Sequence, residues 1–242
     1  MLDSIKNLSK KIFLNMPVLF AISILFMDLV AILAPILAHF GFTGVAHAIY
    51  FIYQFLCHQR PWRSLHLFDY QVAWCTRDTF IYLSMGFSAI AVVLFKIRGV
   101  KWYIALISLL PFAIDGTIQL IAEFVGLTGG QEVFFYASTN FNRMLTGSIF
   151  GTGAGLWLFS LLAETLDEEF EDNLRKNKIK PNKKKNILTF FSIVVICFLF
   201  YIGLVQIWNL TSEKYKPSGL LDNVRYFPGY NYEDVKGGAH GV

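Results

Sequence analysis

The chain has 242 residues, of which 55% are hydrophobic and 16% are charged, with a formal net charge of +4. Ordinary soluble domains carry about a quarter charged residues, so this composition excludes a soluble enzyme or binding domain. Several apolar runs reach the roughly 20 residues that a helix needs to cross a hydrocarbon core of about 30 Å. Because a spanning backbone must satisfy its own hydrogen bonds, we predict an all-α, polytopic transmembrane bundle with five to six spanning helices.

The apolar segments are predicted to be helical over residues 17–39, 44–56, 79–95, 102–127, 144–163 and 187–208. The first contains Asp28, which must face protein, because a carboxylate exposed to lipid at that depth costs several kcal/mol. Residues 1–209 are therefore interpreted as a single transmembrane domain. The remaining residues, 210–242, are rich in Pro, Gly and Tyr, and we expect them to form a peripheral or partly ordered tail.

The basic residues predict the orientation. Lys and Arg gather around residues 96–101 and 175–185, and such loops stay in the cytoplasm. With the basic N-terminus also inside, the segment 44–57 is re-entrant or interfacial and five helices span; if that segment spans, there are six and the N-terminus is outside. We prefer five spans in the plasma membrane, with the charged loop 164–185 cytoplasmic. Either arrangement places the loop 57–78 and the C-terminus outside.

The stretch 53–82, called here the polar island, contains two cysteines, two histidines and five charged residues between apolar segments. Outside the cell, Cys57 and Cys75 would meet an oxidising compartment, which favours a disulfide. The alternatives are a metal pair with His58 or His66, and two unpaired thiols. Adjacent Cys57 and His58 differ from the Cys-x-x-Cys spacing of structural zinc sites, so we predict no metal, and no cofactor can be named.

Asp115 and Gln119 lie four residues apart in the segment 102–127 and therefore share a helix face. An intramembrane carboxylate needs a partner; Arg143 is preferred, and Arg77 is the alternative. The pair could simply fix helix register, or it could be the floor of a polar cavity. That cavity would open outward and be lined by Cys57, His58, Gln59, Arg63, Arg77, Asp115, Gln119, Asn142 and Arg143.

The segment 144–163 carries Gly147, Gly151 and Gly155 at intervals of four residues. Glycines at this spacing form a stripe along one side of a helix, where a neighbouring helix can approach closely. We therefore expect close helix packing along this face.

Four separated stretches, CHQRPWRSLHLF, WCTRDTFIYL, DGTIQ and NFNRMLTGSIFG, occur in order. Together they resemble the uncharacterised bacterial and archaeal membrane family called domain of unknown function 2085, over about residues 45–155. Many relatives read CARCTG where this chain reads WCTRDT, which weakens any Cys-x-x-Cys role. The resemblance implies no established reaction, but it singles out Cys57, His58, Gln59, Arg63, Ser64, His66, Cys75, Arg77, Tyr82, Asp115, Gly116, Gln119, Arg143 and Gly147.

Three classes of function follow. In the first, Arg63, Arg77 and Arg143 hold a small or lipid-borne anionic group by charge-assisted hydrogen bonds, and His58, His66 or Asp115 serve as acid or base. The second is a transporter or an accessory subunit of a membrane complex. The third is a thiol-redox protein using the two island cysteines. Whether the protein is an enzyme stays open. The expected partners are the bilayer and complex subunits, not nucleic acid.

Overall fold

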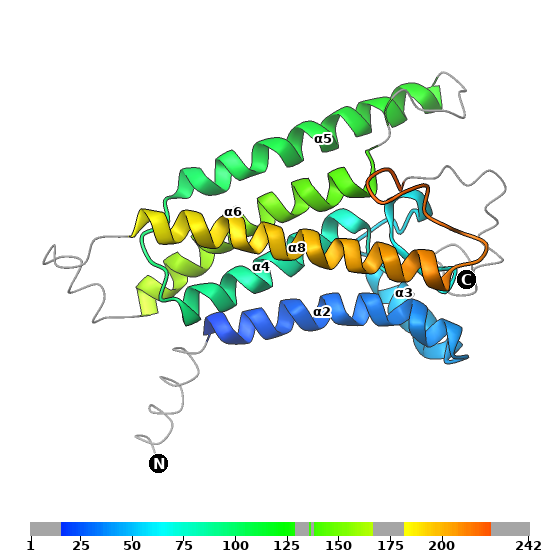
Figure 1. The fold of residues 1–242 in the computed structure, drawn as a ribbon, viewed down its shortest axis with the longest axis horizontal. Coiled ribbons are helices and arrows are strands. Elements are labelled where there is room, and N and C mark those ends of the chain that lie inside the picture. Colours follow the sequence, from blue (N-terminus) through cyan, green and yellow to red (C-terminus); the bar gives the residue numbers. More distant parts are fainter. Residues whose placement is uncertain (1–15, 129–135, 137, 167–181, 224–242) are drawn as a thin grey trace, which may run out of the picture.

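The computed structural model describes residues 16–128, 136, 138–166 and 182–223. Its long helices run alongside one another as a bundle (Figure 1) and are α2 (Met16–His39), α4 (Thr76–Leu94), α5 (Trp102–Thr128), α6 (Asn140–Leu166) and α8 (Lys183–Thr211). Within the described ranges, these five are long and apolar enough to cross a membrane. The predicted all-α transmembrane bundle is thus confirmed. Most of the charged loop 164–185 lies outside the described residues.

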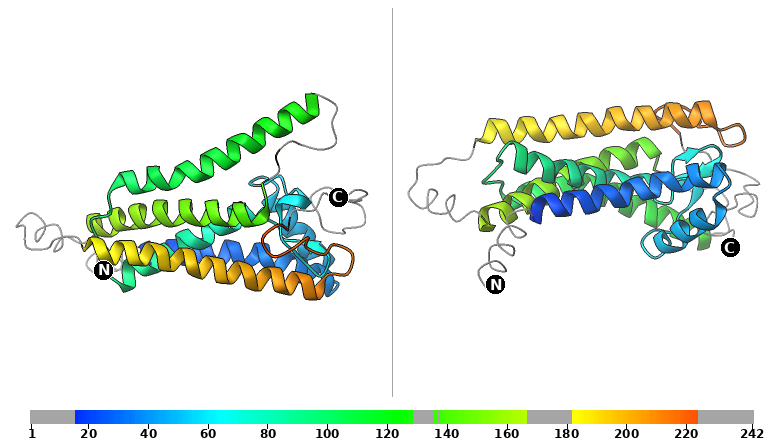
Figure 2. Two further views of the ribbon diagram at one scale, coloured as in Figure 1. Left: turned by 45° about the horizontal axis from the view of Figure 1, so that its top comes forward. Right: turned by 90° about the horizontal axis from the view of Figure 1, so that it is seen from below.

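The apolar segment after α2 forms the short helix α3 (Thr43–Tyr53). Its 11 residues extend only about 17 Å at 1.5 Å per residue, which is too short for a bilayer core. It packs against α2 at one end of the bundle, as two views show (Figures 1 and 2). The structure therefore favours five spans over six.

The described residues of the two basic segments, 96–101 and 182–185, lie at the end of the bundle opposite α3. Lys185, at the start of α8, donates a hydrogen bond to the carbonyl of Phe95 at the end of α4. Nearby, the side chain of Asn186 donates to the carbonyl of Arg98 at 3.3 Å. The polar island and the residues after α8 occupy the other end (Figure 1). The basic segments and the island are therefore separated by the length of the bundle.

The glycine stripe of α6 packs on α4, as predicted. A Cβ atom built on Gly147 would lie 2.7 Å from the carbonyl oxygen of Arg77, and one on Gly151 would lie 2.3 Å from that of Ile81. One on Gly155 would approach the side chain of Ser88 at 2.8 Å. Since real Cβ contacts are never this short, the backbones of α4 and α6 touch only because these residues are glycines. This contact fixes the position of the Arg77 backbone, from which the side chain extends to Asp115.

The island contains a small hairpin that the sequence did not predict. Strands β1 (His66–Leu67) and β2 (Tyr70–Gln71) pair in antiparallel fashion. Between them, Phe68 and Asp69 have φ values of 54° and 66°, the left-handed conformations of a tight two-residue hairpin turn. The Asp69 carboxylate accepts backbone N–H groups of residues 213, 214 and 215 at 2.9 to 3.0 Å. The described part of the tail is therefore ordered and anchored to the island, while the division into a membrane domain 1–209 and a tail 210–242 stays a prediction.

Candidate functional site

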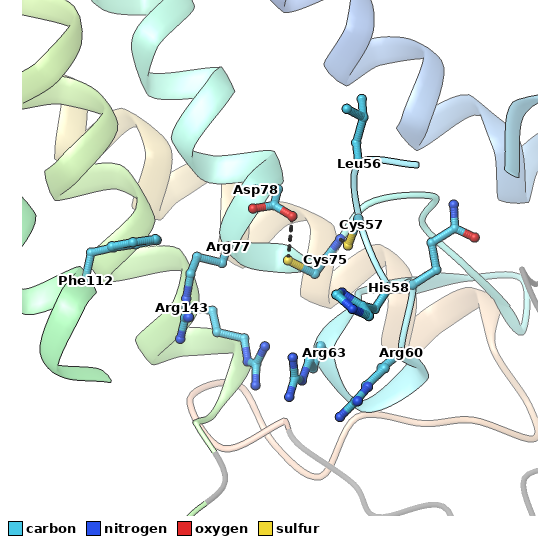
Figure 3. Close-up of a pocket in the computed structure, with 11 residues that line it drawn as sticks. Leu56, Cys57, His58, Arg60, Arg63, Cys75, Arg77, Asp78, Phe112 and Arg143 are labelled. Atoms are coloured by element: carbon cyan, nitrogen blue, oxygen red, sulfur yellow. Dashed lines mark hydrogen bonds between the residues drawn. The ribbon is translucent and has the colours of Figure 1, made fainter. Parts of the chain in front are cut away.

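A cavity of about 190 Å³ lies where the polar island meets α4, α5 and α6. Its wall combines thiols, carboxylate and guanidinium groups with two apolar side chains (Figure 3). The residues that line it are Leu56, Cys57, His58, Gln59, Arg60, Arg63, Cys75, Arg77, Asp78, Phe112 and Arg143. The site thus joins residues from stretches that are distant in the sequence.

Guanidinium groups dominate one side of this cavity. Arg60 precedes, and Arg63 ends, the 3₁₀ turn η1 (Pro61–Arg63), whose three residues per turn place both on one side. Figure 3 shows them beside Arg143, which is 2% exposed. Burial, followed by the charges of Arg143, Arg60 and Arg77, lowers the pKa of Arg63 to about 9. An arginine keeps its proton at neutral pH, so crowding these positive charges costs free energy.

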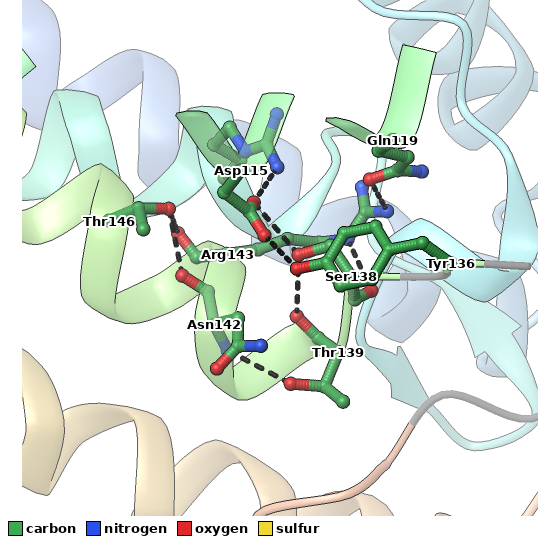
Figure 4. A network of polar contacts seen from close by, with 9 residues as sticks. Asp115, Gln119, Tyr136, Ser138, Thr139, Asn142, Arg143 and Thr146 are labelled. Carbon is green, nitrogen blue, oxygen red and sulfur yellow. Dashed lines mark hydrogen bonds and ion pairs between the residues drawn. The ribbon is translucent and has the colours of Figure 1, made fainter. Parts of the chain in front are cut away.

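Asp115 of α5 forms its ion pair with Arg77. The preference for Arg143 as its partner is therefore wrong, and the alternative is right. The reason is local: a Cβ atom on residue 116 would lie 3.1 Å from the Arg77 guanidinium, so Gly116 leaves room for that side chain. The Asp115 carboxylate also accepts hydrogen bonds from Tyr136 at 2.6 Å and Ser138 at 2.8 Å (Figure 4). Its charge is thus well compensated.

Arg143 is held by different partners. It donates to the side chain of Gln119 and, at 3.0 Å, to the carbonyl of Ser138. The start of α6 is fixed by Thr139, whose hydroxyl accepts the N–H of Asn142 at 3.1 Å, as an N-cap residue does. This cap extends the helix through its polar first turn (Figure 4), and Arg143 follows that turn and lines the cavity.

The two island cysteines are free thiols, and the predicted disulfide is not formed in this structure. Nevertheless, their sulfur atoms and a carboxylate oxygen of Asp78 all lie within 4.8 Å of one another. The N–H of Cys75 donates to the sulfur of Cys57 at 3.3 Å, and the Cys75 thiol donates to Asp78 at 3.1 Å. The hydrogen bond between the two thiols lowers the pKa of Cys57 and raises that of Cys75.

Not every predicted site residue reaches the cavity. His66 is buried and stacks on Trp208 with 5.1 Å between ring centroids, and burial lowers its pKa to about 3. Gln59 lines the cavity, but its amide donates to the carbonyl of Tyr50 at 2.9 Å. Asp115, Gln119 and Asn142 are not among the residues that line the cavity, so they do not form the predicted floor. Asp115 instead pairs with Arg77, and Gln119 accepts a hydrogen bond from Arg143. His58 does line the cavity.

Several functional candidates were missed by the sequence analysis. Asp78 lies three residues after Cys75, a spacing that places both at the start of one helix on the same side and could have revealed it. Asn140 donates to the carbonyl of Ser64 at 3.3 Å and accepts from Thr76 at 3.0 Å, so it joins α6 to both the island and α4. Its place three residues before Arg143 was visible in the N-x-x-R pattern. The remaining missed residues are Arg60, Phe112, Tyr136 and Ser138.

Comparisons with known proteins match the part of the chain that contains the cavity. The sequence profile of the predicted membrane protein family DUF2085 matches residues 57–157, which include the cavity from Cys57 to Arg143. The uncharacterised protein MJ1492 of Methanocaldococcus jannaschii is 32% identical over 161 residues, which cover 62% of this chain and 94% of the relative. No solved structure matches the chain.

Proposed function

This chain belongs to the predicted membrane protein family called domain of unknown function 2085, and from its site we propose that it binds a small anionic group. The cavity faces the outside of the cell, and the anion is either free in solution or carried by a lipid headgroup. The observation that carries this proposal is the meeting of Arg63, Arg77 and Arg143 in one wall. They come from the island, α4 and α6.

Crowded guanidinium groups are suited to an anion for two reasons. Each presents a planar fork of donors that matches the oxygens of a carboxylate or phosphate, and such charge-assisted hydrogen bonds are the stronger ones. An anion would also relieve the mutual repulsion that, together with burial, lowers the pKa of Arg63. Arg77 and Arg143 already hold fixed positions through Asp115 and Gln119, so little ordering is required on binding.

The surroundings of the cavity suit a group carried by a lipid as well as a free one. Phe112 lines it from α5, and only 17% of the most apolar stretch of that helix is buried inside the protein. Leu56, on the opposite rim, is 60% exposed. An acyl chain could therefore lie against apolar side chains while its headgroup occupies the arginine wall.

The outward orientation rests on the separation of charge along the bundle. The basic segments around Arg98 and Lys185 share the end opposite the island. Because Lys- and Arg-rich loops remain in the cytoplasm, the island, α3 and the end of α8 face outward in the plasma membrane. We expect a membrane-impermeant thiol reagent, applied to intact cells, to label a cysteine introduced at Lys214 but none introduced at Lys101.

The binding test uses the full chain in detergent, with inorganic phosphate and short-chain phosphatidic acid as separate probes in calorimetry. We expect Arg63→Gln to weaken binding about tenfold or more, because a hydrogen bond to a charged group contributes about 1.5–3 kcal/mol. Arg98→Gln, at the other end of the bundle, is the matched control and should bind as the wild type does. Binding of phosphatidic acid alone would identify a lipid-borne ligand. If neither probe binds, or Arg63→Gln binds both normally, the proposal fails.

A further inference from the structure

The cavity wall also brings together three metal-ligating groups. The sulfur atoms of Cys57 and Cys75 and a carboxylate oxygen of Asp78 lie within 4.8 Å of one another. In a tetrahedral zinc site with Zn–S bonds of about 2.3 Å, neighbouring sulfur atoms are roughly 3.8 Å apart. Small side-chain rotations therefore suffice to bring all three atoms onto one ion.

The start of α4 brings two of these three groups together. Cys75 is the N-cap of α4 and Asp78 lies three residues later, and side chains at these two positions meet at a helix start. The Cys75 thiol accordingly donates to Asp78 at 3.1 Å. A metal ion would replace that thiol proton, because a protein thiol releases its proton when it binds a metal. The backbone N–H directed at Cys57 (3.3 Å) is the kind of outer hydrogen bond that supports a metal-bound thiolate.

The net charge of the liganded ion is compatible with the arginines beside it. Two thiolates and one carboxylate around a divalent ion leave one net negative charge, and Arg143 is close enough to Cys75 for their charges to attract. Separately, Asp28 is 2% exposed, and among the described residues its carboxylate oxygens have no hydrogen-bond partner. It is also near enough to Asp78 for the two carboxylates to repel. A like charge nearby favours the protonated form of one of the two carboxyl groups, and a cation bound by Asp78 would remove that repulsion.

We propose that Cys57, Cys75 and Asp78 bind a divalent metal ion of the zinc class, with a fourth coordination position open to the cavity. Three protein ligands and one open position are typical of zinc sites that bind a water molecule or a substrate, whereas structural sites are closed by four protein ligands. This inference goes beyond anion binding and does not depend on it, because the ligands and the arginines are different residues and can be changed separately.

The test uses reduced, metal-free full chain in detergent, titrated with Co²⁺ as the probe. Thiolate coordination gives a sulfur-to-cobalt charge-transfer band in the near ultraviolet, and tetrahedral geometry gives intense visible bands. We expect one Co²⁺ per chain, displaced by Zn²⁺, with a charge-transfer band that weakens in Cys57→Ser and in Cys75→Ser and is lost when both substitutions are combined. Cys197→Ser, which changes the buried cysteine of α8, is the matched control and should keep the band.

A third variant keeps the test informative if the serine variants fold poorly. Asp78→Asn retains both thiols, so it should keep a charge-transfer band but bind Co²⁺ more weakly than the wild type. Reduced wild-type protein that binds no Co²⁺, with Cys57 and Cys75 recovered from membranes as a disulfide, would overturn the metal site in favour of a thiol-redox pair. A band that survives both serine substitutions would also overturn it. Phosphate binding, measured on the same samples, reports separately on the anion site.

Discussion

Arg77 and Asp115 form an ion pair that ties α4 to α5. Within its most apolar stretch, α5 is 17% buried inside the protein, against 56% for α4 and for α6, so α5 lies at the edge of the bundle (Figures 1 and 2). Its apolar surface faces lipid and offers little to fix its rotation. The ion pair, with the hydrogen bonds from Tyr136 and Ser138 to the same carboxylate, therefore sets the face that α5 presents to the cavity.

Removal of the Asp115 charge should destabilise the protein. We expect Asp115→Leu to cost about 3 kcal/mol, because breaking one side of a buried pair leaves the other charge uncompensated. The double variant Arg77→Met, Asp115→Leu should recover part of that loss, since apolar replacement of both partners is often tolerated. Thermal unfolding in detergent measures both. Ile114→Ala, at a position 59% exposed on the same helix, is the control, and an equal loss in it would contradict this role.

The glycine stripe gives a second prediction. Gly151→Ala would place a Cβ atom 2.3 Å from the carbonyl oxygen of Ile81, which forces α4 and α6 apart. Overpacking of this kind costs about 1–3 kcal/mol. Gly203→Ala in α8 meets nothing within 4 Å and should leave the unfolding temperature unchanged or slightly raised, because alanine is the better helix former. Equal unfolding temperatures for the two variants would show that α4 and α6 can move apart at this contact without a loss of stability.

The sequence predicted the long helices because hydrophobic length is a local property that the bilayer selects. It placed their polar starts too late. The apolar pattern predicts a start at residue 144 for α6, whereas the helix begins at Asn140; Thr139 caps a polar first turn that a search for apolar runs does not detect. Likewise α4 begins at Thr76 and not at residue 79. These hidden first turns carry Arg77, Asp78 and Arg143.

The sequence could identify Arg77, Asp115 and Arg143 as site candidates but not their pairing. Arg77 and Arg143 both lie near the start of a helix on the same side of the membrane, so spacing alone gives no reason to prefer either for Asp115. The choice depends on the contact of α4 with α6 at Gly147 and on the space beside Gly116. Both are properties of helices packed in three dimensions, and no single segment contains them.

His66 should make stability depend on pH. Burial lowers its pKa to about 3, whereas an unfolded histidine has a pKa near 6.5. Between these values the unfolded state binds the extra proton, so stability is complete above pH 6.5 and falls as the pH drops towards 3. At pH 5 the loss is about 2 kcal/mol, from roughly 1.5 pKa units at 1.36 kcal/mol each.

The substitution that tests this effect is His66→Phe, which can keep the stacking on Trp208 but cannot take up a proton. We expect the unfolding temperature of the wild type to fall more steeply between pH 7 and pH 5 than that of the variant. The difference in slope is the readout, because any lost hydrogen bond shifts the variant equally at both pH values. Parallel slopes would mean that the buried imidazole is not a source of acid sensitivity.

Asp69 should hold the chain after α8 against the island. Its carboxylate accepts three successive backbone N–H groups, from residues 213 to 215, and Trp208 donates to the carbonyl of Tyr215 beside them. Asp69→Gly keeps the left-handed φ of 66° that this turn requires, because glycine adopts it freely, but it removes the acceptor. The variant therefore separates anchoring from turn geometry.

We expect trypsin to cleave Asp69→Gly after Lys214 at least several-fold faster than it cleaves the wild type, because cleavage needs a locally released backbone. Asp222→Ala removes another exposed carboxylate close to the same segment and should leave the rate unchanged. His66 stacks on Trp208 and lies 6.0 Å from the ring of Tyr215, so release should also expose this histidine to solvent. If Asp69→Gly is cleaved as slowly as the wild type, the chain after α8 is held instead by Trp208 and by the packing of Tyr215.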